Sequence, residues 1–136
     1  MISHERNLTT KDRQKFLLQL FERSFIDRNG LKTSEKRLKA IGKGGVSGQA
    51  VKKRSTEVIR YISEKSNKSF PIIGVGGIAK GEDVSEFLMA GATATQIGTA
   101  TFANPRAPQK ILKGFSKWCK DQGLDQVNKL IGVAHG

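Results

Sequence analysis

Two short apolar runs that each end in small residues constrain the fold of this 136-residue chain more than any other feature. The first run, residues 70–75, ends in Gly76-Gly77, and the second, residues 93–97, ends in Gly98-Thr99. A helix-length segment separates the two. Alternation of strand, helix and strand favours a parallel sheet with a right-handed crossover connection. We therefore expect both runs to be strands that end at the same edge of one sheet.

The rest of the chain predicts helices around these two strands. Residues 31–43 are polar and cationic, and we expect a loop there, followed by a glycine-rich turn at residues 44–48. The strand at 70–75 is almost wholly apolar, as is typical of a parallel strand that is covered on both faces. The predicted fold class is α/β: the C-terminal portion of a TIM (β/α)8 barrel, truncated, with an extra N-terminal helix. Helices are expected over residues 11–26, 49–64, 82–90, 104–122 and 125–130.

Three of these helices carry apolar residues at helical spacing, and we expect those residues to form the core. The expected buried sets are Val51, Val58, Ile59 and Ile62, then Val84, Phe87 and Leu88, then Ile111, Leu112, Phe115, Trp118 and Cys119.

The positive charge of the chain is concentrated towards its N-terminus. The net charge is +12, and residues 1–60 hold 15 Lys and Arg against 6 Asp and Glu, whereas residues 61–136 hold 9 against 6. A basic front segment can bind nucleic acid. Here no aromatic residues are interleaved for base stacking and no zinc-ligand spacing occurs, so a solvated or poorly structured basic face is favoured and nucleic-acid binding is the alternative.

The compartment follows from what the sequence does not contain. No run of 18 or more apolar residues is present, and residues 1–10 lack the apolar core of a signal peptide. The single cysteine excludes an internal disulfide and fits a reducing compartment. We expect a soluble, cytoplasmic protein that does not bind membranes.

The two strand ends also predict an anion site. In β/α barrels the last two loops after strands commonly bind a phosphate, and glycine lets backbone N–H groups approach it closely. The first helical turn after the second strand, residues 100–103, would add further N–H groups. The alternative is that each glycine only ends a strand or a helix and binds nothing. We favour the phosphate site because three such turns occur together; its residues, the strand-end site, are Gly48, Gly76, Gly77, Gly98 and Thr99.

Other reactive residues are better explained as structural. Cys119 lies four residues after Phe115 on an apolar stripe, which indicates a core thiol. His4 and His135 have no partner at metal-ligand spacing, so no metal is expected. The adjacent acids Glu82 and Asp83 fit the first turn of a helix better than a general-acid pair.

Four motifs resemble dihydroorotate dehydrogenase. They are GGVSG at residues 44–48, PIIGVGGI at 71–78, GEDVSEFLMAGA at 81–92 and QIGTATFANP at 96–105. The chain is most similar to the C-terminal part of the class 1 enzymes, particularly the class 1B catalytic subunit, and the ending LIGVAH at 130–135 fits that subfamily too. The resemblance covers roughly residues 31–136 and is strong across 44–105; residues 1–30 form an N-terminal helical segment without it.

This resemblance implies an FMN-dependent oxidation of dihydroorotate to orotate in pyrimidine (UMP) biosynthesis. The strand-end site would hold the FMN phosphate and ribityl end. By the class 1B resemblance, the electrons would pass to a second subunit that carries FAD and an iron–sulfur cluster, with NAD as the final acceptor. The sequence does not distinguish NAD from fumarate as the acceptor. Homo-oligomerisation is also compatible with the open sheet edges that two strands leave.

The chain also departs from the family pattern. The active-site base, an FMN-contacting lysine and the substrate-binding asparagines of the family's N-terminal half cannot be placed here, so no catalytic residue is assigned. Lys53 replaces a proline, and Ser55-Thr56 replaces apolar residues. A catalytically inactive remnant is therefore the alternative to an enzyme fragment, with a basic nucleic-acid-binding module as a third hypothesis.

Overall fold

The structure, a computed structural model, describes residues 32–42 and 44–135, so the helix predicted over 11–26 and His4 lie outside the described residues. The chain divides into two compact units, residues 1–46 and residues 47–136. No helix in the described ranges has both the length and the apolar character needed to cross a bilayer.

The described part of the first unit contains a helix where we predicted a loop. Helix α2 (Glu35–Ile41) has no buried residue, so local signals account for it. The Ser34 side chain accepts a hydrogen bond from the Arg37 N–H at 3.4 Å and caps the helix. Glu35 in the first turn and Lys39 in the last turn both suit the helix dipole. The loop predicted over 31–43 is therefore wrong in its centre.

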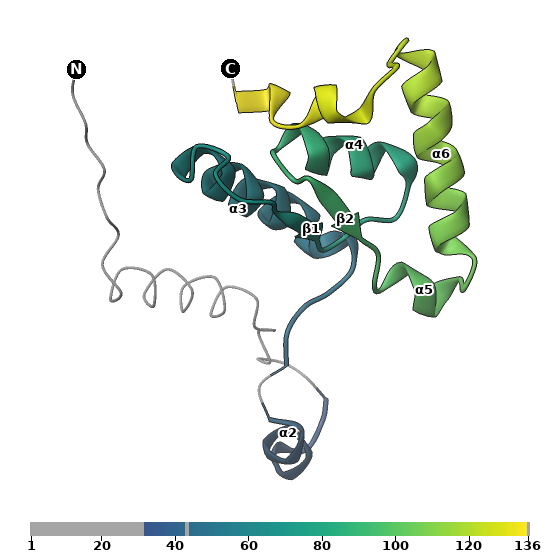
Figure 1. Ribbon diagram of the computed structural model, residues 1–136. Coiled ribbons are helices and arrows are strands. Elements are labelled where there is room, and N and C mark those ends of the chain that lie inside the picture. The colour runs from purple at the N-terminus through teal and green to yellow at the C-terminus, as the bar shows by residue number, and fades with distance from the viewer. Residues whose placement is uncertain (1–31, 43, 136) are drawn as a thin grey trace, which may run out of the picture. The chain divides into compact units, whose positions relative to one another are not determined.

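The second unit alternates helices and strands as predicted, and its two described strands pair in parallel (Figure 1). Strand β1 (Ile73–Val75) and strand β2 (Ala94–Gln96) are shorter than expected because only three residues of each have a ladder partner. The helix predicted over 125–130 is a 3-10 turn. The other elements are η1 (Gln49–Val51), α3 (Lys52–Lys65), α4 (Gly81–Met89), α5 (Ala100–Ala103), α6 (Ala107–Asp121), η2 (Val127–Leu130) and η3 (Val133–His135).

Helix α4 is the centre of the core, between the sheet and α6 (Figure 1). The predicted inner residues Val84, Phe87 and Leu88 are all buried, and Phe87 is fully inaccessible. A Cβ built on Gly74 would lie 2.6 Å from Phe87 Cδ1 and 3.2 Å from Ile59 Cδ1. The same face of β1 therefore touches α4 and α3, and glycine is required there by close packing.

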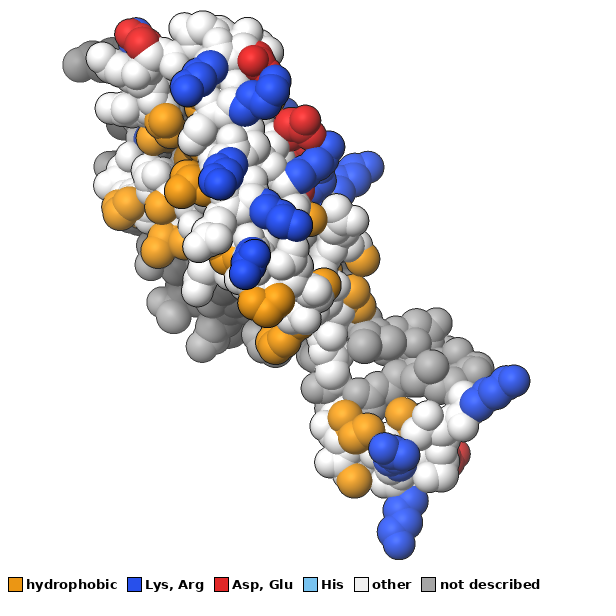
Figure 2. All heavy atoms as spheres, turned by 90° about the vertical axis from the view of Figure 1, so that its right-hand side faces the viewer, with side chains coloured by type: hydrophobic (Ala, Val, Ile, Leu, Met, Phe, Trp, Pro, Cys, Tyr) orange, Lys and Arg blue, Asp and Glu red, His pale blue; other side chains and the backbone are white. Residues whose placement is uncertain are grey.

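The outer helices are less buried than the sequence predicted. Of the four apolar residues expected to be buried on η1 and α3, only Ile59 is buried. On α6, Ile111, Phe115 and Cys119 are buried, as predicted, but Leu112 is 65% exposed. Leu112 follows Ile111 by 100° around the helix, which turns it out of the buried arc. Figure 2 shows Lys and Arg side chains spread over the face that α6 presents; the exposed lysines of this helix are Lys110, Lys113, Lys117 and Lys120.

The described residues cover one face of the sheet only. Gly74 points into the core, whereas its neighbours Ile73 and Val75 are 64% and 47% exposed. Successive side chains of a strand point to opposite faces, so the apolar face formed by Ile73 and Val75 has no cover within the described residues. The described residues therefore do not cover both faces of this strand as we expected.

Candidate functional site

The turn after β1 is shaped by two glycines with left-handed backbone angles. Gly76 has φ +115° and Gly77 has φ +84°, a region that other residues rarely adopt. Space is also restricted, since a Cβ on Gly76 would overlap the Ser55 hydroxyl. A Cβ on Gly77 would lie 2.7 Å from Lys52 Cβ and 2.9 Å from the carbonyl oxygen of Gly48. The chain after β1 thus passes directly against the start of α3.

The predicted strand-end residues lie together. Gly77 approaches the Gly48 carbonyl, and a Cβ on Gly48 would lie 3.6 Å from Thr99 Cγ2. The turn before α3, the turn after β1 and the turn after β2 are therefore neighbours. We predicted this convergence from the parallel arrangement of the strands. Occupation of the site by an anion stays a prediction.

Several backbone donors at this site make no loop contact with the described residues. Outside the pairing of β1 with β2, no backbone hydrogen bond to another described residue engages the N–H groups of the five strand-end residues, Gly48, Gly76, Gly77, Gly98 and Thr99. By contrast, the next turn is internally bonded: the Thr101 N–H donates to the Gly98 carbonyl at 2.9 Å, and the Phe102 N–H donates to the Thr99 carbonyl at 3.1 Å. Adjacent backbone N–H groups without acceptors form concave sites that attract anions.

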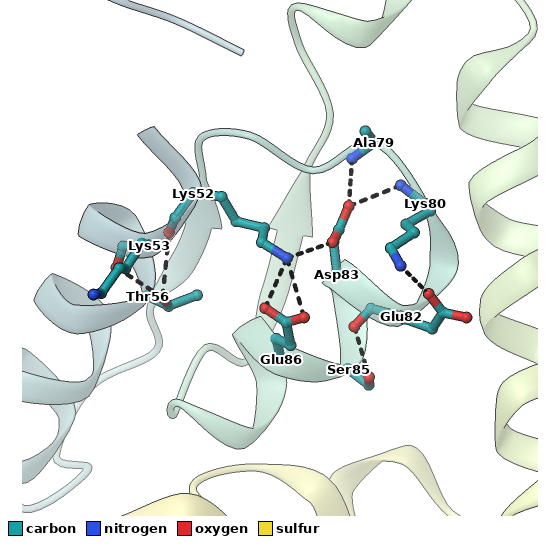
Figure 3. Close-up of polar contacts among 9 residues, drawn as sticks. All are labelled: Lys52, Lys53, Thr56, Ala79, Lys80, Glu82, Asp83, Ser85 and Glu86. Carbon is teal, nitrogen blue, oxygen red and sulfur yellow. Dashed lines mark hydrogen bonds and ion pairs between the residues drawn. The ribbon is translucent and has the colours of Figure 1, made fainter. Parts of the chain in front are cut away.

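A buried ion pair that the sequence analysis missed supports the turn after β1 (Figure 3). The Asp83 side chain is 1% exposed. Its Oδ2 accepts hydrogen bonds from the Ala79 N–H at 2.8 Å and the Lys80 N–H at 2.9 Å. Its Oδ1 accepts one from Lys52 Nζ at 2.8 Å, and Lys52 also contacts Glu86 Oε2 at 3.0 Å. The ion pair connects the start of α3 to the start of α4.

The pKa values of both partners follow from these contacts. Burial by itself would raise the pKa of Asp83, but hydrogen bonds from Lys52 and from the backbone at Ala79 and Lys80 outweigh it and lower that pKa. The hydrogen bond to Asp83, and then that to Glu86, raises the pKa of Lys52. Both groups are therefore charged at neutral pH.

Cys119 and the two acids at the start of α4 lie in the structural positions that we predicted. Cys119 is a buried free thiol in the core. Asp83 is a first-turn residue of α4, and Glu82 in the same turn pairs with Lys80. His135 Nε2 lies 2.9 Å from the Ala90 carbonyl oxygen. Within residues 32–42 and 44–135, no three His, Cys, Asp or Glu side chains come close enough to hold a metal.

The family is shown by a comparison with protein-family models. The model described as "Dihydroorotate dehydrogenase" matches residues 6–118. The chain belongs to the dihydroorotate dehydrogenase family. The matched range begins within residues 1–30, where the sequence alone gave us no sign of a resemblance.

Curated dihydroorotate dehydrogenases confirm the resemblance. The "Dihydroorotate dehydrogenase B (NAD(+)), catalytic subunit" of Trichlorobacter lovleyi is 40% identical over 93 residues, which cover 68% of this chain and 30% of the relative. The "Dihydroorotate dehydrogenase (quinone)" of Christiangramia forsetii is 57% identical over 99 residues, which cover 73% of this chain and 27% of the relative. The chain thus spans about 30% of the length of the curated dehydrogenases that it matches.

The fold agrees with this assignment. A crystal structure of ligand-free DHODH from Eimeria tenella superposes with a TM-score of 0.68 at 24% identity. The superposed region covers 95% of this chain and 38% of the Eimeria tenella chain. This likeness shows that the α/β arrangement of the described residues is shared with part of a dihydroorotate dehydrogenase.

Proposed function

We propose that this chain supplies the FMN phosphate-binding part of a dihydroorotate dehydrogenase. The whole enzyme would oxidise dihydroorotate to orotate in de novo pyrimidine biosynthesis, and this chain would be the C-terminal part of its barrel. The observation that carries the proposal is the convergence of the strand-end residues in a chain of this family; outside the pairing of β1 with β2, their backbone N–H groups have no backbone acceptor among the described residues. A phosphate accepts several such hydrogen bonds at once.

The residues present fit a phosphate because their donors are backbone N–H groups that glycine leaves without a side chain. A Cβ on Gly76 or Gly77 would overlap its neighbours, so the turn in this form requires glycine at both positions. The Thr99 hydroxyl can add one side-chain donor. We propose that Gly48, Gly76, Gly77, Gly98 and Thr99 bind the phosphate and the ribityl end. When bound, FMN supplies the hydride acceptor; the residues of this chain would orient it.

The substrate and electron-transfer partner of the whole enzyme are proposed from the relatives' names and the family resemblance, and the strand-end residues do not identify them. Relatives carry names with three electron acceptors, fumarate, NAD(+) and quinone, and those named for NAD(+) are called catalytic subunits. We propose dihydroorotate as substrate and, by the class 1B resemblance, an electron-transfer subunit with FAD and an iron–sulfur cluster. The strand-end site does not distinguish between acceptors, because a flavin phosphate is the same in each case.

FMN binding tests the proposal directly. We expect the purified chain to quench FMN fluorescence in a saturable titration, and Gly77→Ala to abolish this, since alanine would be strained at φ +84° and would collide with Lys52 and Gly48. Gly123→Ala is the matched control: Gly123 also has a left-handed φ, +63°, but no atom lies within 4 Å of an added Cβ. Absence of binding by the unaltered chain would overturn the proposal.

Catalysis by this chain alone is not part of the proposal. The family's base and substrate-binding asparagines cannot be placed in the sequence, so we expect no dihydroorotate-dependent dye reduction with added FMN. Turnover at the level of whole family enzymes would contradict this expectation. A colourless protein whose melting temperature does not respond to FMN would favour the second candidate function, an inactive remnant.

A further inference from the structure

Lys52 occupies a position that joins the strand-end site to the core. Its Cβ would be 2.7 Å from a Cβ on Gly77, so its backbone forms one wall of the turn after β1. Its side chain then leads away from that turn, and its Nζ contacts Asp83 and Glu86 of α4 (Figure 3). The ammonium is engaged by two carboxylates, so it is not a phosphate ligand in this arrangement.

Asp83 acts on the same turn from the other side. The backbone N–H groups of Ala79 and Lys80 donate to its Oδ2, and these residues follow Gly77 after a single intervening residue, Ile78. Ile78 is itself 4% exposed. The segment from Gly77 to Lys80 is therefore held at one end against Lys52 and at the other by Asp83.

From these contacts we infer that Lys52 and Asp83 are positioning residues for the phosphate site: their ion pair holds the Gly76–Gly77 turn so that its N–H groups face an anion. The inference rests on the proposed function and extends it to two residues that need not touch the ligand. The lysine supplies a fixed wall, and the carboxylate fixes the loop that follows. Neither the family motif nor the glycine pattern assigns a positioning role to Lys52 or Asp83.

A purely structural role for the ion pair would give a different result. If Lys52 only stabilised the packing of α3 on α4, then its loss would lower the folded fraction but leave the affinity of the folded protein for FMN unchanged. If it positions the turn, then affinity falls even when every molecule is folded. The two roles therefore separate when FMN titrations are done at a temperature where each variant is fully folded by circular dichroism.

The test compares four proteins in FMN fluorescence titrations: the unaltered chain, Lys52→Met, Lys52→Arg and Lys53→Met. We expect Lys52→Met to weaken FMN binding by roughly tenfold, as small displacements of positioning groups do. Lys52→Arg, which keeps the charge, should restore much of the affinity. Lys53→Met is the matched control, because Lys53 is the adjacent exposed lysine and forms no ion pair with a described acid.

Amide exchange gives a second readout that needs no ligand. The Ala79 and Lys80 amides should exchange faster in Lys52→Met and in Asp83→Asn than in the unaltered chain, because both changes weaken the contact that protects them. Equal FMN affinity of Lys52→Met and the unaltered chain would overturn the inference while leaving the proposed function intact. Failure of the unaltered chain to bind FMN would overturn the proposed function and this inference with it.

Discussion

The two faces of the β1–β2 sheet differ sharply. On one face Gly74 is buried beneath Phe87 and Ile59, and α3 and α4 pack against the strand. On the other face Ile73 and Val75 are largely exposed, although both are β-branched and apolar. The residues of the strand suit burial on both sides, but the described chain covers only one.

This difference shows which face of the sheet the described chain can cover with its own helices. The covered face depends on helices that are close to the strands in sequence, so a short chain can form it. In a β/α barrel the other face is filled by inward-pointing side chains from several strands. The chain matches about 30% of its relatives' length, and in the barrel that we propose for the whole enzyme, strands outside this part would cover that face.

The largest expected effect is the loss of Phe87 from the covered face. Its side chain is fully inaccessible, so Phe87→Ala should lower the free energy of unfolding by about 3–5 kcal/mol. That loss is a large fraction of the roughly 5–15 kcal/mol by which a typical domain is stable. The measurement is urea unfolding followed by circular dichroism.

Phe102→Ala provides the control for Phe87, because Phe102 is 90% exposed. Its replacement should change the free energy of unfolding by no more than about 0.5 kcal/mol. Equal effects at the two positions would mean that α4 does not form the centre of the core.

The Asp83 carboxylate should make the free energy of unfolding depend on pH in the acid range. Because its pKa is lower in the folded chain than in the unfolded chain, the stabilisation is complete above about pH 4 and is lost as the pH falls through the folded pKa. Asp83→Asn should cost about 1.5–3 kcal/mol at neutral pH and should flatten this part of the pH profile of unfolding. An unchanged profile would show that Asp83 is not ionised and paired in solution.

Asp121→Asn is the matched control for that experiment. Asp121 is also paired with a lysine, Lys117, at 2.6 Å, but it lies on the exposed face of α6. Exposed ion pairs contribute little to stability. We expect Asp121→Asn to change the free energy of unfolding at neutral pH by no more than about 0.5 kcal/mol.

Gly74→Ala tests the close approach of β1 to the helices. The added methyl group would lie 2.6 Å from Phe87 Cδ1 and 3.1 Å from Ala92 Cβ, and overpacking of this kind costs about 1–3 kcal/mol. Gly98→Ala is the control, since its added Cβ would meet no atom within 4 Å and its φ is not left-handed. Thermal unfolding should separate the two variants by several degrees; equal melting temperatures would contradict the packing seen at Gly74.

Much of the second unit could be predicted from the sequence because its signals are local and repeated. The three inner residues of α4 follow helical spacing, and parallel strands require their ends to meet, which brought Gly77 and Thr99 together. Predictions failed where a distant or missing neighbour decides the outcome. Residues 70–72 are apolar but have no ladder partner, and Ile73 is exposed because nothing described covers it.

The missed ion pair illustrates the same limit at the candidate site. Asp83 stands three residues after Lys80, where an acidic side chain can accept the N–H group that begins a helix, and that local pattern could have been recognised. Its partner Lys52 is 31 residues away in the sequence and is one of three consecutive cations. Only the packing of α3 against α4 selects Lys52 from these three.

The smallest expected effect on folding lies on the uncovered face. Ile73 is 64% exposed, so Ile73→Thr, which keeps a β-branched side chain, should change the free energy of unfolding by about 0.5 kcal/mol or less. An exposed apolar face beside open sheet edges also favours self-association. Light scattering should therefore show weaker concentration-dependent association for Ile73→Thr than for the control Val133→Thr. Val133 is 54% exposed and lies outside the sheet. A destabilisation as large as that of Phe87→Ala would mean that the face is covered in the isolated chain, and the contrast between the two faces would then be wrong.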